Sequence, residues 1–156
     1  MTLSHLTGIF SPFTLEANYN VEIPQFQKPF TICHELSHLQ SYMVEIEANF
    51  IAYLACINSD NEYFNYSGYL IAYIYVSNAL YKNDVDVSYY YNQLPEKTYE
   101  DLKENQQFWN DNDTLAEITN TINDAYLKAN SVAEGTNSYS EVVNYIYSYH
   151  YQNNLL

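Results

Sequence analysis

The sequence predicts a mainly α, α+β fold, in which one or two N-terminal β-strands precede several helices. Three observations predict it. One early segment alternates strictly between apolar and polar residues. Most of the remaining chain has helical apolar patterns that begin at capping residues. The 156 residues suit a single domain with its own core, so one domain over residues 1–156 is predicted.

The alternating segment covers residues 13–23. A period of two predicts a half-buried β-strand with its apolar residues on one face. Residues 5–10 are predicted to pair with it as a hairpin, through a turn at Ser11 and Pro12. The predicted apolar face consists of Phe13, Leu15, Ala17, Tyr19, Val21 and Ile23.

Three helices are predicted next, over about 29–40, 44–58 and 60–82, followed by a polar connection at 83–88. The second is apolar nearly all round after its first turn, which is typical of a buried helix. The third is predicted to begin at a capping box formed by Ser59 and Glu62, because a hydroxyl and a carboxylate at this spacing can satisfy free backbone N–H groups.

Three further helices are predicted: from Pro95 to about 110, from about 114 to 130, and from Ser138 to about 152. Asp113 suits the N-cap of the second, because its carboxylate can accept from the first free N–H groups. Ser138 and Glu141 form a capping box at the start of the third.

The helix predicted at 29–40 contains the pattern H-E-x-x-H, with His34, Glu35 and His38. Residues four apart lie on one face of an α-helix, one turn from each other. Both histidines can therefore direct a ring nitrogen to one Zn²⁺ ion. Glu35 lies beside that position, where it can take a proton from a metal-activated water.

Apolar residues around the motif favour a mostly buried helix over an exposed one with two surface histidines. Buried imidazoles and a buried carboxylate need partners, and a metal ion would supply one. The two cysteines lie in helical apolar surroundings and are predicted to be small buried hydrophobes. The residues concerned are Phe30, Ile32, Leu36 and Leu39, with the cysteines Cys33 and Cys56.

Two histidines do not complete a catalytic zinc site, which typically has three protein ligands. Glu45 and Glu47 are the downstream candidates. If the helix continued unbroken, Glu45 would lie about 10 Å beyond His38, too far for a shared ion. The chain must therefore turn within residues 40–42, although this segment contains neither Gly nor Pro.

If the turn forms, Glu45 and Asn49 share a face of the following helix and return to the histidines. Glu45 would then be the third ligand, and Asn49 would orient a ligand histidine by a hydrogen bond. Two alternatives stay open at this point. Glu47 can be the ligand, or both acids can simply favour the positive end of the helix dipole.

The net charge of −14, with no arginine, excludes the usual nucleic-acid partners, because phosphates would be repelled. An anionic membrane surface would be repelled for the same reason. The longest apolar stretch, residues 69–76, is far shorter than a membrane span, so no membrane insertion by this chain itself is predicted. The first residues also lack the pattern of a signal peptide.

The motif His34–His38, followed by the segment Glu45–Cys56, resembles the bacterial domain-of-unknown-function family 3810, which is similar to the gluzincin-type zinc peptidases. Residues 10–18, 66–69 and 138–140 extend the resemblance over most of the chain. It implies a zincin-like helical domain. It also implies Glu45 as third ligand, from the pattern E-x-x-A-N, with Asn49 where many relatives have Asp.

The same resemblance implies two further properties. Family members usually have Gly where Ser41 stands, which would ease the predicted turn. Many members carry N-terminal membrane helices, so the resemblance suggests a membrane-tethered bacterial protein whose anchor is absent from this chain.

The leading functional hypothesis is zinc-dependent hydrolysis of a peptide or protein substrate. His34, His38 and Glu45 would hold one Zn²⁺ ion, and Glu35 would be the general base. An edge of the strand at 13–23 could pair with an extended peptide. The oxyanion donor is predicted to be Tyr139, with Tyr66 and His150 as other candidates.

Two other hypotheses remain. One is a non-catalytic zinc-binding interaction domain, whose partner would bind a surface rich in the chain's 19 tyrosines. The retention of Glu35 argues against it, because a structural zinc site needs no general base. The weaker hypothesis is a zincin-like fold without metal that acts as an inhibitor or adaptor.

Overall fold

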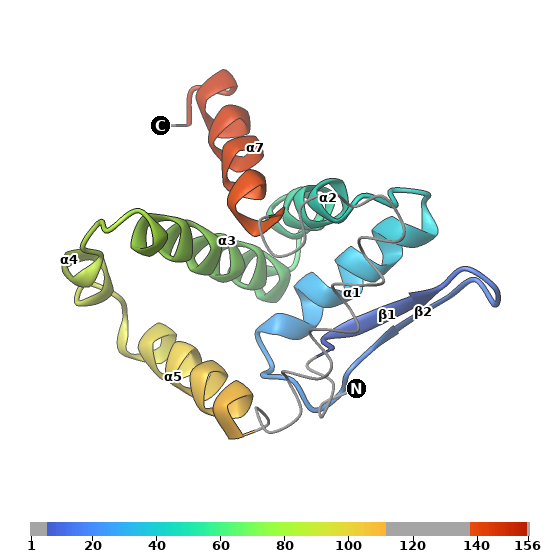
Figure 1. Cartoon of the computed structure of the whole chain (residues 1–156), viewed down its shortest axis with the longest axis horizontal. Helices are drawn as coiled ribbons and strands as arrows, with labels where there is room; N and C mark the ends of the chain where they lie inside the picture. Colours follow the sequence, from blue (N-terminus) through green and yellow to red (C-terminus); the bar gives the residue numbers. More distant parts are fainter. Residues whose placement is uncertain (1–5, 112–137, 156) are drawn as a thin grey trace.

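The computed structural model describes residues 6–111 and 138–155, and this part of the chain is mainly helical, with a small sheet near its N-terminus (Figure 1). The predicted fold class is therefore confirmed. The elements are β1 Gly8–Ser11, β2 Glu16–Tyr19, α1 Gln27–Leu39, α2 Glu45–Ile57, α3 Glu62–Lys82, α4 Ser88–Tyr91, α5 Glu96–Asp111 and α7 Ser138–Gln152.

The hydrophobic core lies where α1, α2, α3 and α7 meet. Its largest fully buried side chain is that of Tyr53 on α2. Helices α2 and α3 approach closely at Gly68, where an added Cβ would lie 2.7 Å from the Cβ of Cys56. Cys56 is fully buried, as predicted, whereas Cys33 on α1 is half-buried, and both cysteines are free.

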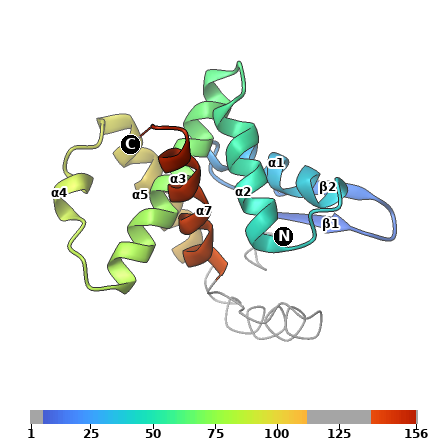
Figure 2. The same cartoon turned by 90° about the horizontal axis from the view of Figure 1, so that it is seen from above.

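Strands β1 and β2 form the predicted antiparallel hairpin, which lies against α1 (Figures 1 and 2). The prediction of one strand over 13–23 is wrong in extent, because only residues 16–19 are extended. Residues 12–15 form the turn, with Leu15 at φ 54°. A regular alternation does not reveal where a hairpin reverses, so Phe13 is 97 % exposed instead of buried.

The prediction of which side of α1 is buried is also partly wrong. Leu36 and Leu39 are exposed, whereas Glu35 and His38 are buried. The reason is that the polar residues of the motif face inward, toward the hairpin and α2. Leu36 is thereby left largely exposed beside β2, and Leu39 is left at the surface.

The other helices agree with prediction to within about two residues at most ends, with three differences. The N-cap of α3 is Asn61, whose side chain accepts from the N–H of Tyr63; Ser59 accepts instead from the N–H of Asn61. The short helix α4 was not predicted. The helix predicted at 114–130, with its N-cap Asp113, lies outside the described residues.

Helix α5 is held by polar contacts to α1 and α3. Its buried Asp101 accepts hydrogen bonds from Tyr66 Oη at 2.6 Å and from Lys97. Gln27 Nε2, in the first turn of α1, donates to Asn105 Oδ1. These contacts hold the N-terminal half of α1 in place. His38, the second histidine of the motif, lies near the opposite end of the helix.

Within the described residues, no helix is both long enough and apolar enough to span a bilayer.

Candidate metal centre

The turn between α1 and α2 has the geometry that Glu45 requires. Helix α1 ends at Leu39, and Ser41 adopts the left-handed conformation with φ 76°. The N–H of Tyr42 donates to Ser37 O at 3.1 Å, and the N–H of Ser41 to His38 O at 2.9 Å. These two bonds define a Schellman motif, usually built on glycine. The predicted turn at residues 40–42 is therefore present, with serine in glycine's place.

This turn brings three potential ligand atoms together, two from α1 and one from the first residue of α2. The Nε2 atoms of His34 and His38 are 3.2 Å apart. Glu45 Oε2 lies 3.3 Å from His34 Nε2, and Glu45 Oε1 lies 3.5 Å from His38 Nε2. The residues His34, His38 and Glu45 thus form a cluster that can bind a metal ion.

The spacing of these groups is compatible with one shared metal ion. Metal–ligand bonds of about 2.0–2.1 Å place neighbouring ligand atoms about 3.0–3.4 Å apart, depending on the coordination angle. The two histidine Nε2 atoms are 3.2 Å apart, and each lies within 3.5 Å of one Glu45 oxygen, Oε2 for His34 and Oε1 for His38. The three side chains therefore converge closely enough to hold one ion.

His38 is oriented for such an ion by the same turn. Its Nδ1 lies 2.8 Å from the carbonyl oxygen of Tyr42, which can only accept a hydrogen bond. Nδ1 therefore carries the proton, and in the neutral ring Nε2 presents a lone pair. His34 lacks this support: its Nδ1 is buried without a hydrogen-bond partner among the described residues.

The pKa shifts follow from this arrangement. Burial raises the pKa of Glu45, but hydrogen bonds and charge interactions with His34 and His38 outweigh burial and lower it to about 2. Burial lowers the pKa of His38, but the hydrogen bond and negative charge of Glu45 prevail and raise it. Positive charge is thus favoured where the three ligand atoms meet, as a metal site requires.

Glu35 lies beside this cluster and beneath the hairpin. It is only 5 % exposed, and a Cβ added at Gly8 of β1 would lie 2.7 Å from its Cδ. Burial raises the pKa of Glu35, against the lowering effect of His34 and His38. Two residues along β1, the ring of Phe10 lies 6.1 Å from that of His38. Strand β1 therefore covers both the carboxylate and one histidine.

The structure distinguishes the two acidic candidates on α2. Glu45 faces the histidines, whereas Glu47 is exposed and outside the cluster. Asn49 is buried one turn after Glu45, and its Oδ1 accepts from Tyr75 Oη at 3.2 Å. Its proposed role in orienting a histidine stays a prediction.

The candidate oxyanion donors have other partners or are not described. The Tyr66 hydroxyl donates to Asp101, and His150 Nε2 shares a hydrogen bond of 2.6 Å with Tyr53 Oη. Tyr139 lies in the first turn of α7, and its side chain is outside the described part of the chain. The choice of Tyr139 therefore stays a prediction.

Two groups at the site, the Tyr42 carbonyl oxygen and Gly8, were not predicted from the sequence. The Tyr42 carbonyl carries no side-chain signal, since any residue supplies one. Gly8 did carry a signal, because a glycine within a strand often marks a close approach of another group. That group is Glu35.

Comparison with known proteins gives one match. A family model described as "Protein of unknown function (DUF3810)" matches residues 1–147. Neither the curated proteins nor the solved structures contain a match to the chain.

Proposed function

Since the chain belongs to the DUF3810 family, whose description assigns no activity, we propose a function from the site itself: zinc-dependent hydrolysis of peptide bonds. The observation that carries this proposal is the convergence of two imidazole Nε2 atoms and one carboxylate, with neighbouring atoms 3.2 to 3.5 Å apart and the buried Glu35 beside them. Two histidines and one glutamate are the ligand set of several gluzincin-type peptidases.

Zinc is the ion proposed for this donor set, because two imidazoles and one carboxylate are a common ligand set of catalytic zinc sites. When bound, it would polarise the scissile carbonyl and lower the pKa of a coordinated water. His34, His38 and Glu45 would hold it. The hydrogen bond from His38 Nδ1 to the Tyr42 carbonyl would keep the His38 ring in its binding orientation and tautomer.

Glu35 would be the general base in this proposal. A carboxylate whose pKa is raised by burial is a better proton acceptor than an ordinary surface glutamate. Its carboxylate would take the proton from the attacking water and pass it to the leaving amine nitrogen. Gly8 supports this role, because a larger residue there would displace the carboxylate.

The test combines metal analysis with a peptide library. Zinc-loaded wild type is expected to cleave peptides, whereas Glu35→Gln should retain zinc and lose about 10²–10⁴-fold in rate, the usual contribution of a positioned acid–base group. Glu47→Gln is the matched control, because Glu47 is exposed and outside the cluster.

Each part of the proposal has a contradicting outcome. Hydrolysis that survives Glu35→Gln would exclude Glu35 as the base. Zinc that remains in Glu45→Ala but leaves Glu47→Ala would exclude the ligand set. Stoichiometric zinc with no cleavage of any library peptide would favour the alternative of a non-catalytic interaction domain with a tyrosine-rich surface.

A further inference from the structure

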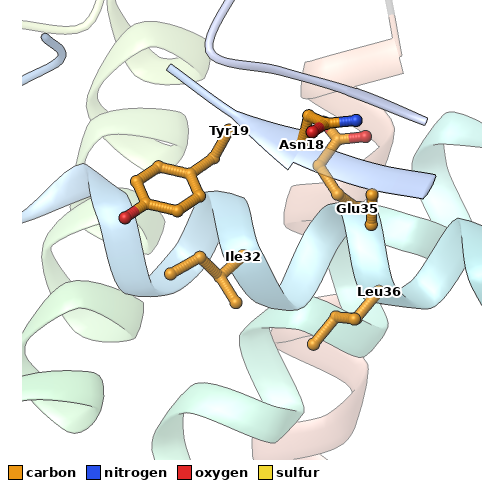
Figure 3. Close-up of a pocket in the computed structure, with 6 residues that line it drawn as sticks. Asn18, Tyr19, Ile32, Glu35 and Leu36 are labelled. Atoms are coloured by element: carbon orange, nitrogen blue, oxygen red, sulfur yellow. The ribbon is translucent and has the colours of Figure 1, made fainter. Parts of the chain in front are cut away.

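A hollow of about 190 Å³ lies between the hairpin and α1, on the flank of Glu35 (Figure 3). The lining comes from two elements. Strand β2 supplies Ala17, Asn18 and Tyr19, and helix α1 supplies Ile32, Glu35 and Leu36.

A small residue of β2 faces α1 at the hollow. Cross-strand partners lie on the same face of a sheet, and Gly8 pairs with Tyr19 while Phe10 pairs with Ala17. Gly8 faces Glu35, so this is the face toward α1. The space at Gly8 is taken by the Glu35 side chain, whereas the small side chain of Ala17, beside Tyr19, leaves the hollow open.

The lining and size select one kind of occupant. Apart from Glu35 and Asn18, the lining side chains are Ala17, Ile32, Leu36 and the ring of Tyr19. A dry apolar cavity of about 150 Å³ is large enough to take a benzene molecule. A space of 190 Å³ therefore suits one medium-sized apolar side chain rather than a whole ligand.

The position of Glu35 connects the hollow to the metal centre. Its side chain lines the hollow, and its carboxylate interacts electrostatically with His34, His38 and Glu45. Glu35 therefore belongs to the surroundings of both, and a peptide whose carbonyl lay within reach of Glu35 would have its neighbouring side chains available to this opening. Exposed Leu36 extends the apolar surface outward from it.

We propose that this hollow is a specificity pocket, which receives one apolar side chain of leucine size adjacent to the hydrolysed bond. The inference rests on the proposed peptidase function and adds the substrate class to it: peptides with an aliphatic residue at one fixed position beside the cleavage site. A basic side chain is the competing occupant, because it could pair with Glu35.

The experiment uses zinc-loaded full chain and two independent readouts. The first is the residue preference around the cleaved bond in a peptide library. The second is the affinity, by calorimetry, of dipeptide hydroxamates that carry a glycine, leucine or lysine side chain. The hydroxamate group binds zinc without turnover, so the second readout remains informative if hydrolysis is absent.

Variants of Ala17 change the volume of the hollow. Ala17→Leu should fill it and Ala17→Gly should enlarge it, and zinc content checks that each variant keeps its site. Glu16→Leu is the control, because Glu16 lies next in the strand, is exposed and is not part of the lining.

We expect wild type to prefer the leucine probe over the glycine probe by about tenfold or more, the effect of filling an apolar pocket. Ala17→Leu should abolish this preference, and Glu16→Leu should preserve it. Equal affinities for the glycine and leucine probes, a lysine preference, or a leucine preference unchanged in Ala17→Leu would overturn the inference. An Ala17-dependent leucine preference without peptide cleavage would support the pocket and contradict the proposed hydrolysis.

Discussion

Helix α2 contacts histidines at both ends, and the two contacts are of opposite kinds. Near its C-terminal end, Tyr53 Oη and His150 Nε2 are 2.6 Å apart, and because a hydroxyl can donate or accept, they form a complete donor–acceptor pair between neutral groups. At its first residue, Glu45 lies 3.5 Å from the Nε2 atom of His38, and with the His38 ring neutral both groups offer a lone pair. The first contact needs no added charge, whereas the second needs a proton or a metal ion between its two groups.

The comparison teaches that burial of a histidine does not by itself identify a metal site. A metal site is indicated when the lone pair of the ring nitrogen points at another acceptor instead of at a hydrogen-bond donor. Burial raises the pKa of Tyr53 to about 12, so its hydroxyl keeps its proton and stays neutral at any physiological pH. Glu45 has the reverse shift, to about 2, and remains a charged acceptor. Four experiments test this contrast, from the largest expected effect to the smallest.

The largest effect is expected on metal affinity. His38→Ala should weaken zinc binding by more than about 100-fold, because removal of a ligand exceeds the 10–100-fold cost of losing an outer hydrogen bond. His150→Ala should leave zinc affinity unchanged. Competition with a chromophoric zinc indicator measures both. A His150→Ala variant that loses zinc as severely as His38→Ala would remove the distinction between the two contacts.

The next effect concerns stability at the other end of α2. His150→Ala leaves the hydroxyl of Tyr53, a residue only 1 % exposed, without this hydrogen-bond partner. This should cost about 1–3 kcal/mol in the free energy of unfolding. Tyr53→Phe should cost less, because His150 is only half-buried and water can replace the lost hydroxyl. Urea unfolding of the metal-free protein measures both variants, and the reverse order would contradict the assignment.

A smaller effect is expected at the turn. Ser41 has φ 76°, a conformation that costs a residue with a Cβ about 1–2 kcal/mol. Ser41→Gly relieves this strain but adds unfolded-state freedom, so a net stabilisation of about 0.5–1 kcal/mol is expected. Ser41→Ala, which keeps the Cβ, should show no gain. Thermal unfolding is the measurement, and equal melting temperatures for the glycine and alanine variants would contradict the strain.

The smallest effect is the pH dependence of the ion pairing, since about a third of the Glu45 side chain is exposed and solvent screens the charges. The pKa of Glu45 is lowered from 4.5 to about 2, so its stabilisation is present above pH 4.5 and lost as pH falls toward 2. The pKa of His38 is raised from 6.5, so its share is present below pH 6.5 and lost as pH rises through the raised value.

The metal-free wild type should therefore exceed Glu45→Gln in stability most clearly between pH 4.5 and 6.5. The two proteins should converge as pH approaches 2. Urea unfolding across this range provides the measurement. A difference that grows below pH 4.5 would contradict a lowered Glu45 pKa.

The parts of the fold that depend on local chemistry were predictable. The spacing of the motif placed two candidate ligands, His34 and His38, on one face of a helix. Because an unbroken helix would carry Glu45 too far from His38 for a shared ion, a turn was required before Glu45. The structure has that turn at Ser41. The core helices followed from apolar patterns, because a helix that is apolar nearly all round must be buried.

The parts that depend on distant contacts were not predictable from the pattern alone. The hairpin reverses at residues 12–15 although its alternation continues through them. Which side of α1 is buried depends on the hairpin and α2, so Leu36 is exposed against expectation. The backbone carbonyl that orients His38 leaves no trace in the sequence, because it belongs to the main chain.

The Schellman turn places all three ligand residues within the twelve residues from His34 to Glu45. Because His34 and Glu45 are so near in sequence, bringing them together costs little chain entropy. A metal held there adds little topological constraint, because α1 and α2 already pack against each other in the core. A single helical hairpin thus supplies all three candidate ligands, so a metal ion would bind there without the rest of the fold having to open.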